Sequence, residues 1–139
     1  MPIPLNENDL VNIQQMEVAV CGPDGASHLI LCTGIARLQG YGQETYTFPV
    51  GPRLIRRQFV AVIASGALSQ FQKKRYTAGD HDDQTMLNAS LLTIMCDYDD
   101  ESGRVIVRAD VLLGTGLEEA SISYQVGILA ELPASLRTK

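Results

Sequence analysis

Residues 105–113 carry an apolar side chain at every second position, and this pattern constrains the fold more than any other feature of the chain. In an extended backbone, one face of this segment carries only apolar side chains: Val105, Val107, Ala109, Val111 and Leu113. The opposite face includes Arg108 and Asp110. Because strand side chains repeat with a period of two, the pattern predicts a β-strand with one face against a core.

The segments on either side of this strand extend the prediction. Residues 87–96 are joined to it by the acidic run 97–103, which ends in Gly103, a residue that tolerates positive φ. This arrangement predicts an antiparallel hairpin. Residues 122–130 alternate in the same way, so we expect a third strand and a three-stranded meander.

The first half of the chain shows shorter versions of the same pattern. Residues 16–20 and 27–38 flank a turn at 22–25 and predict a second hairpin. Glycine and proline then separate two further strand-sized runs, 44–50 and 54–64. Asn8 is expected to cap a short helical turn over 9–15. The periodicity fades over 65–85, and the polar stretch 72–84 predicts a long exposed loop.

These elements favour one architecture. About seven short strands separated by glycine and proline turns predict an all-β fold, either an antiparallel β-sandwich or a flattened barrel, with at most one short helix. A length of 139 residues fits a single domain. Residues 1–14 are expected to form an N-terminal arm and residues 133–139 a C-terminal tail.

Charge and composition limit the classes of partner. The net charge of −5 argues against nucleic acid, because binding to phosphates requires clustered Lys and Arg. Only 19% of the residues are charged, so we expect some apolar surface to be reserved for another subunit in a homo-oligomer or a larger assembly. The chain does not begin with a basic stretch followed by an apolar one, as a secretory signal does, and it contains no run of about 18 apolar residues. We therefore expect a cytoplasmic protein without a membrane partner.

Residues 79–83 contain the densest group of potential metal ligands. Its members are Asp80, His81, Asp82 and Asp83. Carboxylate oxygens and an imidazole nitrogen are ligands for divalent cations. Consecutive residues of one loop seldom converge on an ion without a second segment, however, and acidic loops are common. We therefore predict no cofactor, with a divalent cation at this cluster as the lesser alternative.

A second hypothesis assigns ligand binding to the loop 72–84. Tyr76 and His81 are expected to bind a glycan or a small anion, together with the basic residues Arg56 and Arg57. The competing interpretation is that the arginines protect an edge strand from aggregation.

The sequence offers little for catalysis. It has no Gly-x-Ser-x-Gly elbow and no phosphate-binding glycine loop with its lysine. Cys21, Cys32 and Cys96 are expected to be buried free thiols, with a Cys21–Cys32 bridge as the alternative. We therefore predict a non-catalytic protein.

The preferred hypothesis is a self-associating structural or interaction module. It rests on the segment 86–96, which carries apolar residues on both faces of the predicted strand. One face of that strand would pack on the core and the other on a second layer or subunit.

Overall fold

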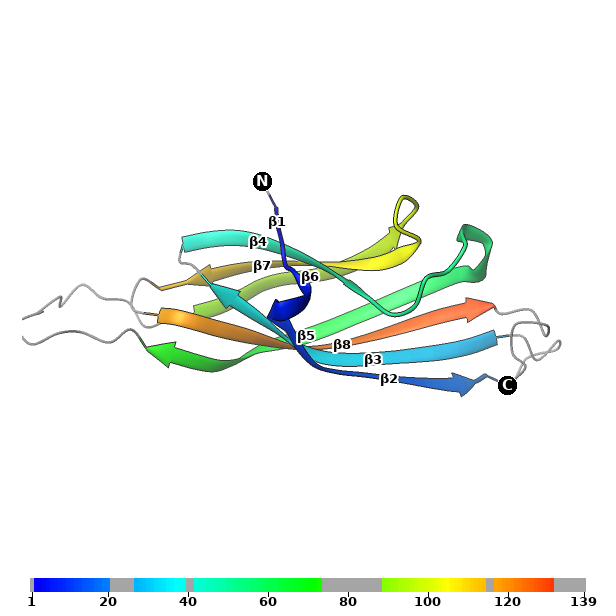
Figure 1. Cartoon of the computed structure of the whole chain (residues 1–139), viewed down its shortest axis with the longest axis horizontal. Helices are drawn as coiled ribbons and strands as arrows, with labels where there is room; N and C mark the ends of the chain where they lie inside the picture. Colours follow the sequence, from blue (N-terminus) through cyan, green and yellow to red (C-terminus); the bar gives the residue numbers. More distant parts are fainter. Residues whose placement is uncertain (1, 21–26, 40–41, 74–88, 115–116, 132–139) are drawn as a thin grey trace, which may run out of the picture.

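The computed structural model describes residues 2–20, 27–39, 42–73, 89–114 and 117–131. In this part of the chain two four-stranded sheets pack face to face (Figure 1). The all-β sandwich expected from the alternating pattern is therefore confirmed. Its strands are β1 (Ile3–Pro4), β2 (Leu10–Ala19), β3 (Ser27–Gln39), β4 (Gly42–Val50), β5 (Phe59–Lys73), β6 (Ala89–Asp99), β7 (Arg104–Leu113) and β8 (Leu117–Glu131). Two short 3-10 helices accompany them, η1 (Glu7–Asp9) and η2 (Arg56–Gln58).

The strands divide equally between the sheets. Sheet A has the order β1-β4-β7-β6, and sheet B has the order β2-β3-β8-β5. All neighbouring strands are antiparallel except β1, which pairs with β4 in parallel. The predicted hairpin β6–β7 is confirmed, and Gly103 has a φ of 73° at its tip. The strands of the predicted first hairpin also pair as β2 and β3, whereas its turn at 22–25 lies outside the described residues.

The strand pair β3–β8 of sheet B and the strand pair β4–β7 of sheet A come from consecutive segments of the chain, because β3 precedes β4 and β7 precedes β8. Strands β3 and β8 pair as far as Gln39 and Glu119, and β4 and β7 pair from Gly42 and Leu113 onward. The last pair of β3 with β8 and the first pair of β4 with β7 therefore lie next to each other along the chain. The predicted meander was wrong, because β4 and β6 occupy both hydrogen-bonding edges of β7, and β8 pairs instead with β3 and β5.

Strand β6 contains an irregularity that the sequence pattern did not indicate. Its register with β7 shifts between Leu91 and Thr93, as in a β-bulge. The shift places Leu91 and Ile94 against the core and turns Met95 outward. Leu92 and Met95 are exposed, so β6 carries apolar residues on both faces, as predicted, although polar residues such as Ser90 and Thr93 interrupt the outer one.

The inner faces of the two sheets form one core. As predicted, every second residue of β7 from Val105 to Leu113 is buried, and β8 buries every second residue from Ala120 to Ala130. The rings of Phe48 and Tyr124 meet between the sheets with centroids 5.0 Å apart. Full burial of one large apolar side chain contributes about 1.5–3 kcal/mol, so this shared core is the main source of stability.

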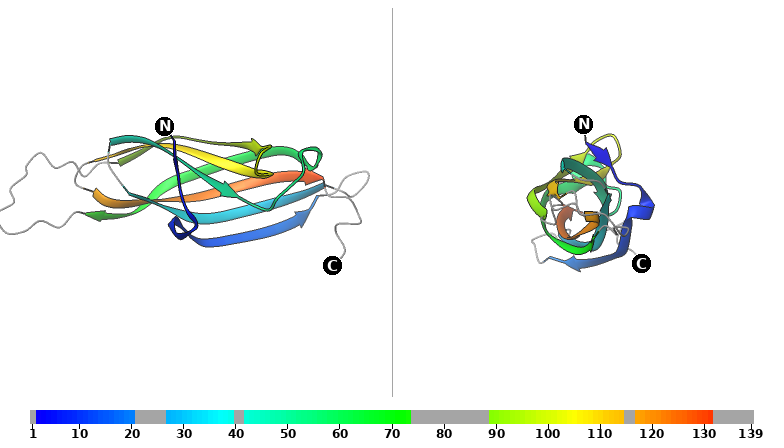
Figure 2. Two further views of the ribbon diagram at one scale, coloured as in Figure 1. Left: turned by 45° about the horizontal axis from the view of Figure 1, so that its top comes forward. Right: turned by 90° about the vertical axis from the view of Figure 1, so that its left-hand side faces the viewer.

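The N-terminal arm joins the two sheets along one side of the sandwich. It runs from β1 in sheet A through η1 to β2 in sheet B (Figure 2). The predicted helical turn over 9–15 was wrong: Asn6 caps η1, and extended structure begins at Leu10, inside the predicted arm 1–14. Pairing of β2 with β3 satisfies more backbone groups than an isolated turn of helix would. Arg37 Nη2 further anchors the arm by donating to the Asn8 carbonyl at 2.6 Å.

Strand β5 is displaced relative to the sequence prediction. It begins at Phe59 rather than near Leu54, because residues 56–58 form η2, and it continues to Lys73. The stretch 65–73, which lacks a clear apolar period, is held in the sheet by pairing with β8. Most of the predicted loop 72–84 lies outside the described residues.

Candidate functional site

The residues predicted to bind ligand or metal separate into two groups. Arg56 and Arg57 are exposed in η2, immediately before β5. Arg56 Nε lies 3.9 Å from Asp100 Oδ1, and its guanidinium lies over the Tyr98 ring at 5.4 Å. The other predicted residues follow β5 in the chain and lie outside the described residues: Tyr76, Asp80, His81, Asp82 and Asp83. The 15-residue strand β5 thus separates the arginines from the start of that segment.

The described residues contain no group of three or more His, Cys, Asp or Glu side chains arranged to hold a metal ion. Cys32 is a buried free thiol, as predicted, and Cys96 is a half-buried one, whereas Cys21 lies outside the described residues. His28 faces the interior, and its Nδ1 lies 3.2 Å from Glu17 Oε2. The metal and loop-ligand hypotheses therefore stay predictions.

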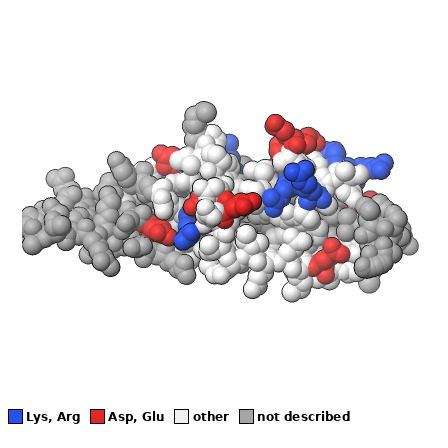
Figure 3. All heavy atoms as spheres, viewed as in Figure 1, with Lys and Arg blue, Asp and Glu red and all other residues white. Residues whose placement is uncertain are grey.

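The outer face of sheet B is an extended surface without charge. Its outward residues over 14–18, 29–35, 61–69 and 121–129 include no Asp, Glu, Lys or Arg. Apolar side chains gather toward one end of it, and we call this group the apolar face: Met16, Val18, Leu29, Leu31, Ile63 and Leu129. Ile63 is 77% exposed and Met16 is 61% exposed. In Figure 3 the surface over β2 and β3 is mostly uncharged.

A hollow lies within the apolar face. It has a volume of about 460 Å³ and is lined on several sides by Leu29, Leu31, Ile63 and Leu129. Gly127 forms its floor, and a Cβ at this position would lie 3.7 Å from Leu29 Cδ1 and Leu31 Cδ2. The hollow therefore exists because Gly127 has no side chain among larger neighbours.

The outer face of sheet A has a different character. The Asp110 carboxylate accepts hydrogen bonds from Thr45 Oγ1 and Thr93 Oγ1, both at 2.5 Å. These bonds, first that from Thr45 and then that from Thr93, hold the pKa of Asp110 below its ordinary value. Arg108 adds a neighbouring charge on the same face. The same outer face also exposes the apolar side chains of Leu92, Met95 and Leu112, so charged and apolar residues are mixed on it.

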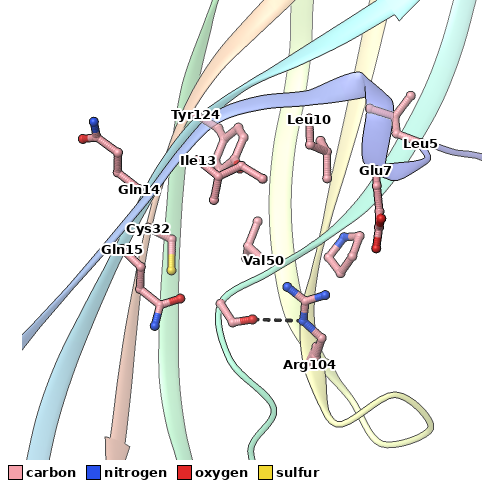
Figure 4. Close-up of a pocket in the computed structure, with 12 residues that line it drawn as sticks. Leu5, Glu7, Leu10, Ile13, Gln14, Gln15, Cys32, Val50, Arg104 and Tyr124 are labelled. Carbon is pink, nitrogen blue, oxygen red and sulfur yellow. Dashed lines mark hydrogen bonds between the residues drawn. The ribbon is translucent and has the colours of Figure 1, made fainter.

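A second cavity lies beneath the N-terminal arm, on the side of the sandwich opposite the close approach of β5 and β6. It has a volume of about 420 Å³. The arm forms its roof, the ends of β4 and β7 form one wall, and β3 and β8 form its floor (Figure 4). The arm is held in place by Leu5 N, which donates to Thr47 O at 2.9 Å, and by the Arg37 bond to Asn8. The cavity therefore depends on residues from both ends of the sequence.

The cavity is lined by one cation, Arg104, by the carboxylate of Glu7, and by the thiol of Cys32 and the phenol of Tyr124. Arg104 Nε donates to the Gly51 carbonyl at 2.9 Å, which fixes the plane of the guanidinium. Burial raises the pKa of Cys32 and of Tyr124, and Arg104 partly opposes both shifts. The thiol and the phenol are thus protonated near neutral pH, when Arg104 is charged. Apolar side chains complete the lining, among them Leu5, Leu10, Ile13 and Val50.

Sequence reasoning missed this cavity for a physical reason. Its residues come from five separated segments, and no local motif connects Gln14 with Arg104 or Tyr124. One local signal does exist in the structure. Asn12 has a φ of 53°, and the register of β2 shifts between Val11 and Gln14, which turns Ile13 toward the cavity. Asn adopts this left-handed conformation more readily than most residues.

None of the helices in the described residues has the length and apolarity that crossing a bilayer requires. Comparison of the chain with protein-family models, with curated proteins and with solved structures found no match.

Proposed function

We propose that this protein is a non-catalytic structural module that associates with copies of itself through the outer face of sheet B. The observation that carries the proposal is the apolar face, where six large apolar side chains lie together on a surface without charge. Soluble monomers rarely expose contiguous apolar patches larger than a few hundred Å². Apolar surface of this kind is favoured at interfaces between subunits.

The size of the surface suits a second copy. Four strands spaced by about 4.8 Å, with between five and nine residues each rising about 3.3 Å, outline roughly 500 Å². Stable interfaces bury about 800 Å² on each partner, so this face and its rim are of the right order. Two copies also repel one another elsewhere, because each carries a net charge of −5. The uncharged face allows close approach without that repulsion.

The shape of the apolar face also supports pairing with an identical surface. Ile63 projects into solvent beside the hollow above Gly127. In a two-fold symmetric dimer the same patch meets itself, so one projection can enter the hollow of the partner and the reverse. A buried aliphatic side chain in each hollow would contribute about 1.5–3 kcal/mol.

Two methionines provide a matched test. Met16 lies on the outer face of sheet B and is 61% exposed, whereas Met95 lies on the outer face of sheet A and is 54% exposed. We expect Met16→Glu to shift the protein toward monomer, because it buries a charge in the interface. Met95→Glu introduces the same charge into an exposed strand and should leave the assembly unchanged. Light scattering on a sizing column measures both.

Two results contradict the proposal. If the wild-type protein is monomeric at micromolar concentration, the proposed self-association does not occur. Equal behaviour of the two glutamate variants would show that the effect arises from net charge rather than from the apolar face. Far-UV circular dichroism of each variant verifies that the sandwich is retained.

The alternative function, ligand binding by the loop 72–84, depends on Tyr76 and His81 and stays a prediction. A thermal melt of the wild-type protein with a panel of glycans, small anions and divalent cations, each against EDTA, tests it, because a ligand that binds only the native state raises the apparent stability.

A further inference from the structure

We propose that the cavity beneath the N-terminal arm binds a small monocarboxylate with an apolar body, with Arg104 as the group that binds the carboxylate. This site is separate from the apolar face, and the inference does not depend on self-association. The cation, the walls and the distribution of charge around the cavity all favour such a ligand.

A hydrogen bond within the protein fixes the orientation of the Arg104 guanidinium. Its Nε is committed to the Gly51 carbonyl at 2.9 Å, which leaves the two terminal nitrogens of the guanidinium as donors. The guanidinium forms no ion pair with any carboxylate among the described residues. A planar guanidinium with two parallel donors matches the geometry of a carboxylate.

Gly51 has two roles in shaping the cavity. Its φ of 75° is a conformation that favours glycine, and it directs the carbonyl to Arg104. A Cβ at this position would lie 2.7 Å from Ile128 Cδ1 and 3.5 Å from Cys32 Sγ. The missing side chain therefore keeps space open between Arg104 and the Cys32 thiol.

The walls indicate what is attached to the carboxylate. In Figure 4, Ile13 and Val50 lie between the polar groups on the two sides of the cavity, with Leu5 and Leu10 above. These aliphatic side chains have no polar atoms to satisfy, so an apolar body suits them. A volume of about 420 Å³ lies within the range of small-molecule sites, about 300–1,000 Å³.

The charges around the cavity favour a ligand with a single negative charge. The ordinary pKa values of a thiol and a phenol already lie above neutral pH, and burial raises those of Cys32 and Tyr124 further, so neither group is an anion that competes for Arg104. Glu7 also lines the cavity, on the same side as Arg104 in Figure 4, and the protein carries a net charge of −5. A ligand with two negative charges would meet this excess of acidic groups with only one arginine to offset it.

Three eight-carbon probes test the proposal on the unmodified protein: octanoate, neutral octanamide and octyl phosphate. Titration calorimetry should show binding of octanoate that is about tenfold or more tighter than that of octanamide, because a hydrogen bond to a charged group contributes about 1.5–3 kcal/mol. Octyl phosphate should bind more weakly than octanoate. Equal binding of octanoate and octanamide would overturn the role of Arg104.

Methyl NMR shows where the probe binds. Octanoate should shift the methyl signals of Ile13 and Val50 and leave those of Ile63 and Leu129 on the apolar face unchanged. The reverse pattern would place the probe in the other hollow and overturn the site. This comparison also separates the inference from the proposed self-association, because either can hold without the other.

Two arginines of the same strand provide matched variants. Arg104→Gln should weaken octanoate binding about tenfold or more, whereas Arg108→Gln, on the outer face of sheet A, should change it less than about twofold. An equal loss in both would indicate an effect of net charge alone. Arg104→Lys retains the charge without the bidentate geometry and should give an intermediate affinity. If Arg104→Gln does not fold, the comparison of the three probes on the wild-type protein still tests the role of Arg104.

Discussion

The outer faces of the two sheets differ although both sheets share one core. On sheet A, Thr45 and Thr93 bind the Asp110 carboxylate, and Arg108 lies on the same surface. On sheet B the corresponding surface has no charged residue over most of its length and ends in the apolar face. The inner faces follow one rule, alternate burial, whereas the outer faces differ: charged and apolar residues are mixed on sheet A, and the apolar residues of sheet B lie together without charge.

The largest expected effect is a difference in the loss of stability between a substitution on the inner face of sheet B and one on its outer face. Ile122 is fully buried, so Ile122→Ala should reduce the free energy of unfolding by about 2–5 kcal/mol. Ile63 is 77% exposed, and Ile63→Ala should reduce it by less than about 0.5 kcal/mol in a monomer. Urea denaturation of both variants in a Met16→Glu background measures these values without a contribution from association.

A large loss of stability from Ile63→Ala in that background would show that Ile63 supports the fold itself. The apolar face would then be part of the core rather than a surface for a second copy.

Two glycines sharpen the same comparison. A Cβ on Gly34, on the inner face, would collide with the Tyr124 hydroxyl, so Gly34→Ala should destabilise the protein by about 1–3 kcal/mol. A Cβ on Gly127, on the outer face, would make ordinary contacts at 3.7 Å. Gly127→Ala should be neutral or stabilising by up to about 1 kcal/mol. Thermal melts of the two alanine variants measure the difference.

Gly127 also tests the proposed interface. Gly127→Val fills the hollow, so we expect it to weaken self-association while the monomer stays folded. An unchanged oligomer would contradict the insertion of Ile63 into the partner's hollow.

The smallest effect concerns the outer face of sheet A. The folded-state pKa of Asp110 is lowered by its threonine partners, so this carboxylate stabilises the fold above its unfolded pKa of about 3.9. That contribution is lost as the pH falls through the lower, folded-state pKa. The double change Thr45→Val and Thr93→Val should raise the pKa of Asp110 toward its ordinary value, as measured by NMR titration.

Asp99 is the internal control for that titration. Its pKa is lowered by hydrogen bonds from Ser102, so the two valine substitutions should not change the pKa of Asp99. A shift of both carboxyl groups would indicate a general change in the fold instead of the loss of two hydroxyl donors.

Several features of the fold could be predicted from local pattern. The alternation from Val105 to Leu113 identified the buried side of β7, and the turn before Gly103 identified the β6–β7 hairpin. These predictions succeeded because face and turn depend on neighbouring residues. The bulge after Leu91 could not be seen in this way, since the register of β6 is decided by its pairing with β7.

The candidate sites were less accessible to sequence reasoning. The prediction of self-association pointed to the segment 86–96, where Leu92 and Met95 are exposed, whereas the apolar face lies on sheet B. There the signal was weak, because Leu29 and Leu31 look like one side of any amphipathic strand. Their exposure follows only from the absence of a third layer over sheet B in the described residues.

The alternating pattern of the chain identifies a β-protein and shows which side of most strands faces a core, because side-chain alternation is a property of the extended backbone. Only the tertiary structure decided which strands pair, which outer face stays uncharged, and that Arg104 meets Ile13 and Cys32 in one cavity. Strand pairing and cavity formation depend on contacts between distant segments. Backbone hydrogen bonds are alike in every strand, so the local sequence carries little information about their partners.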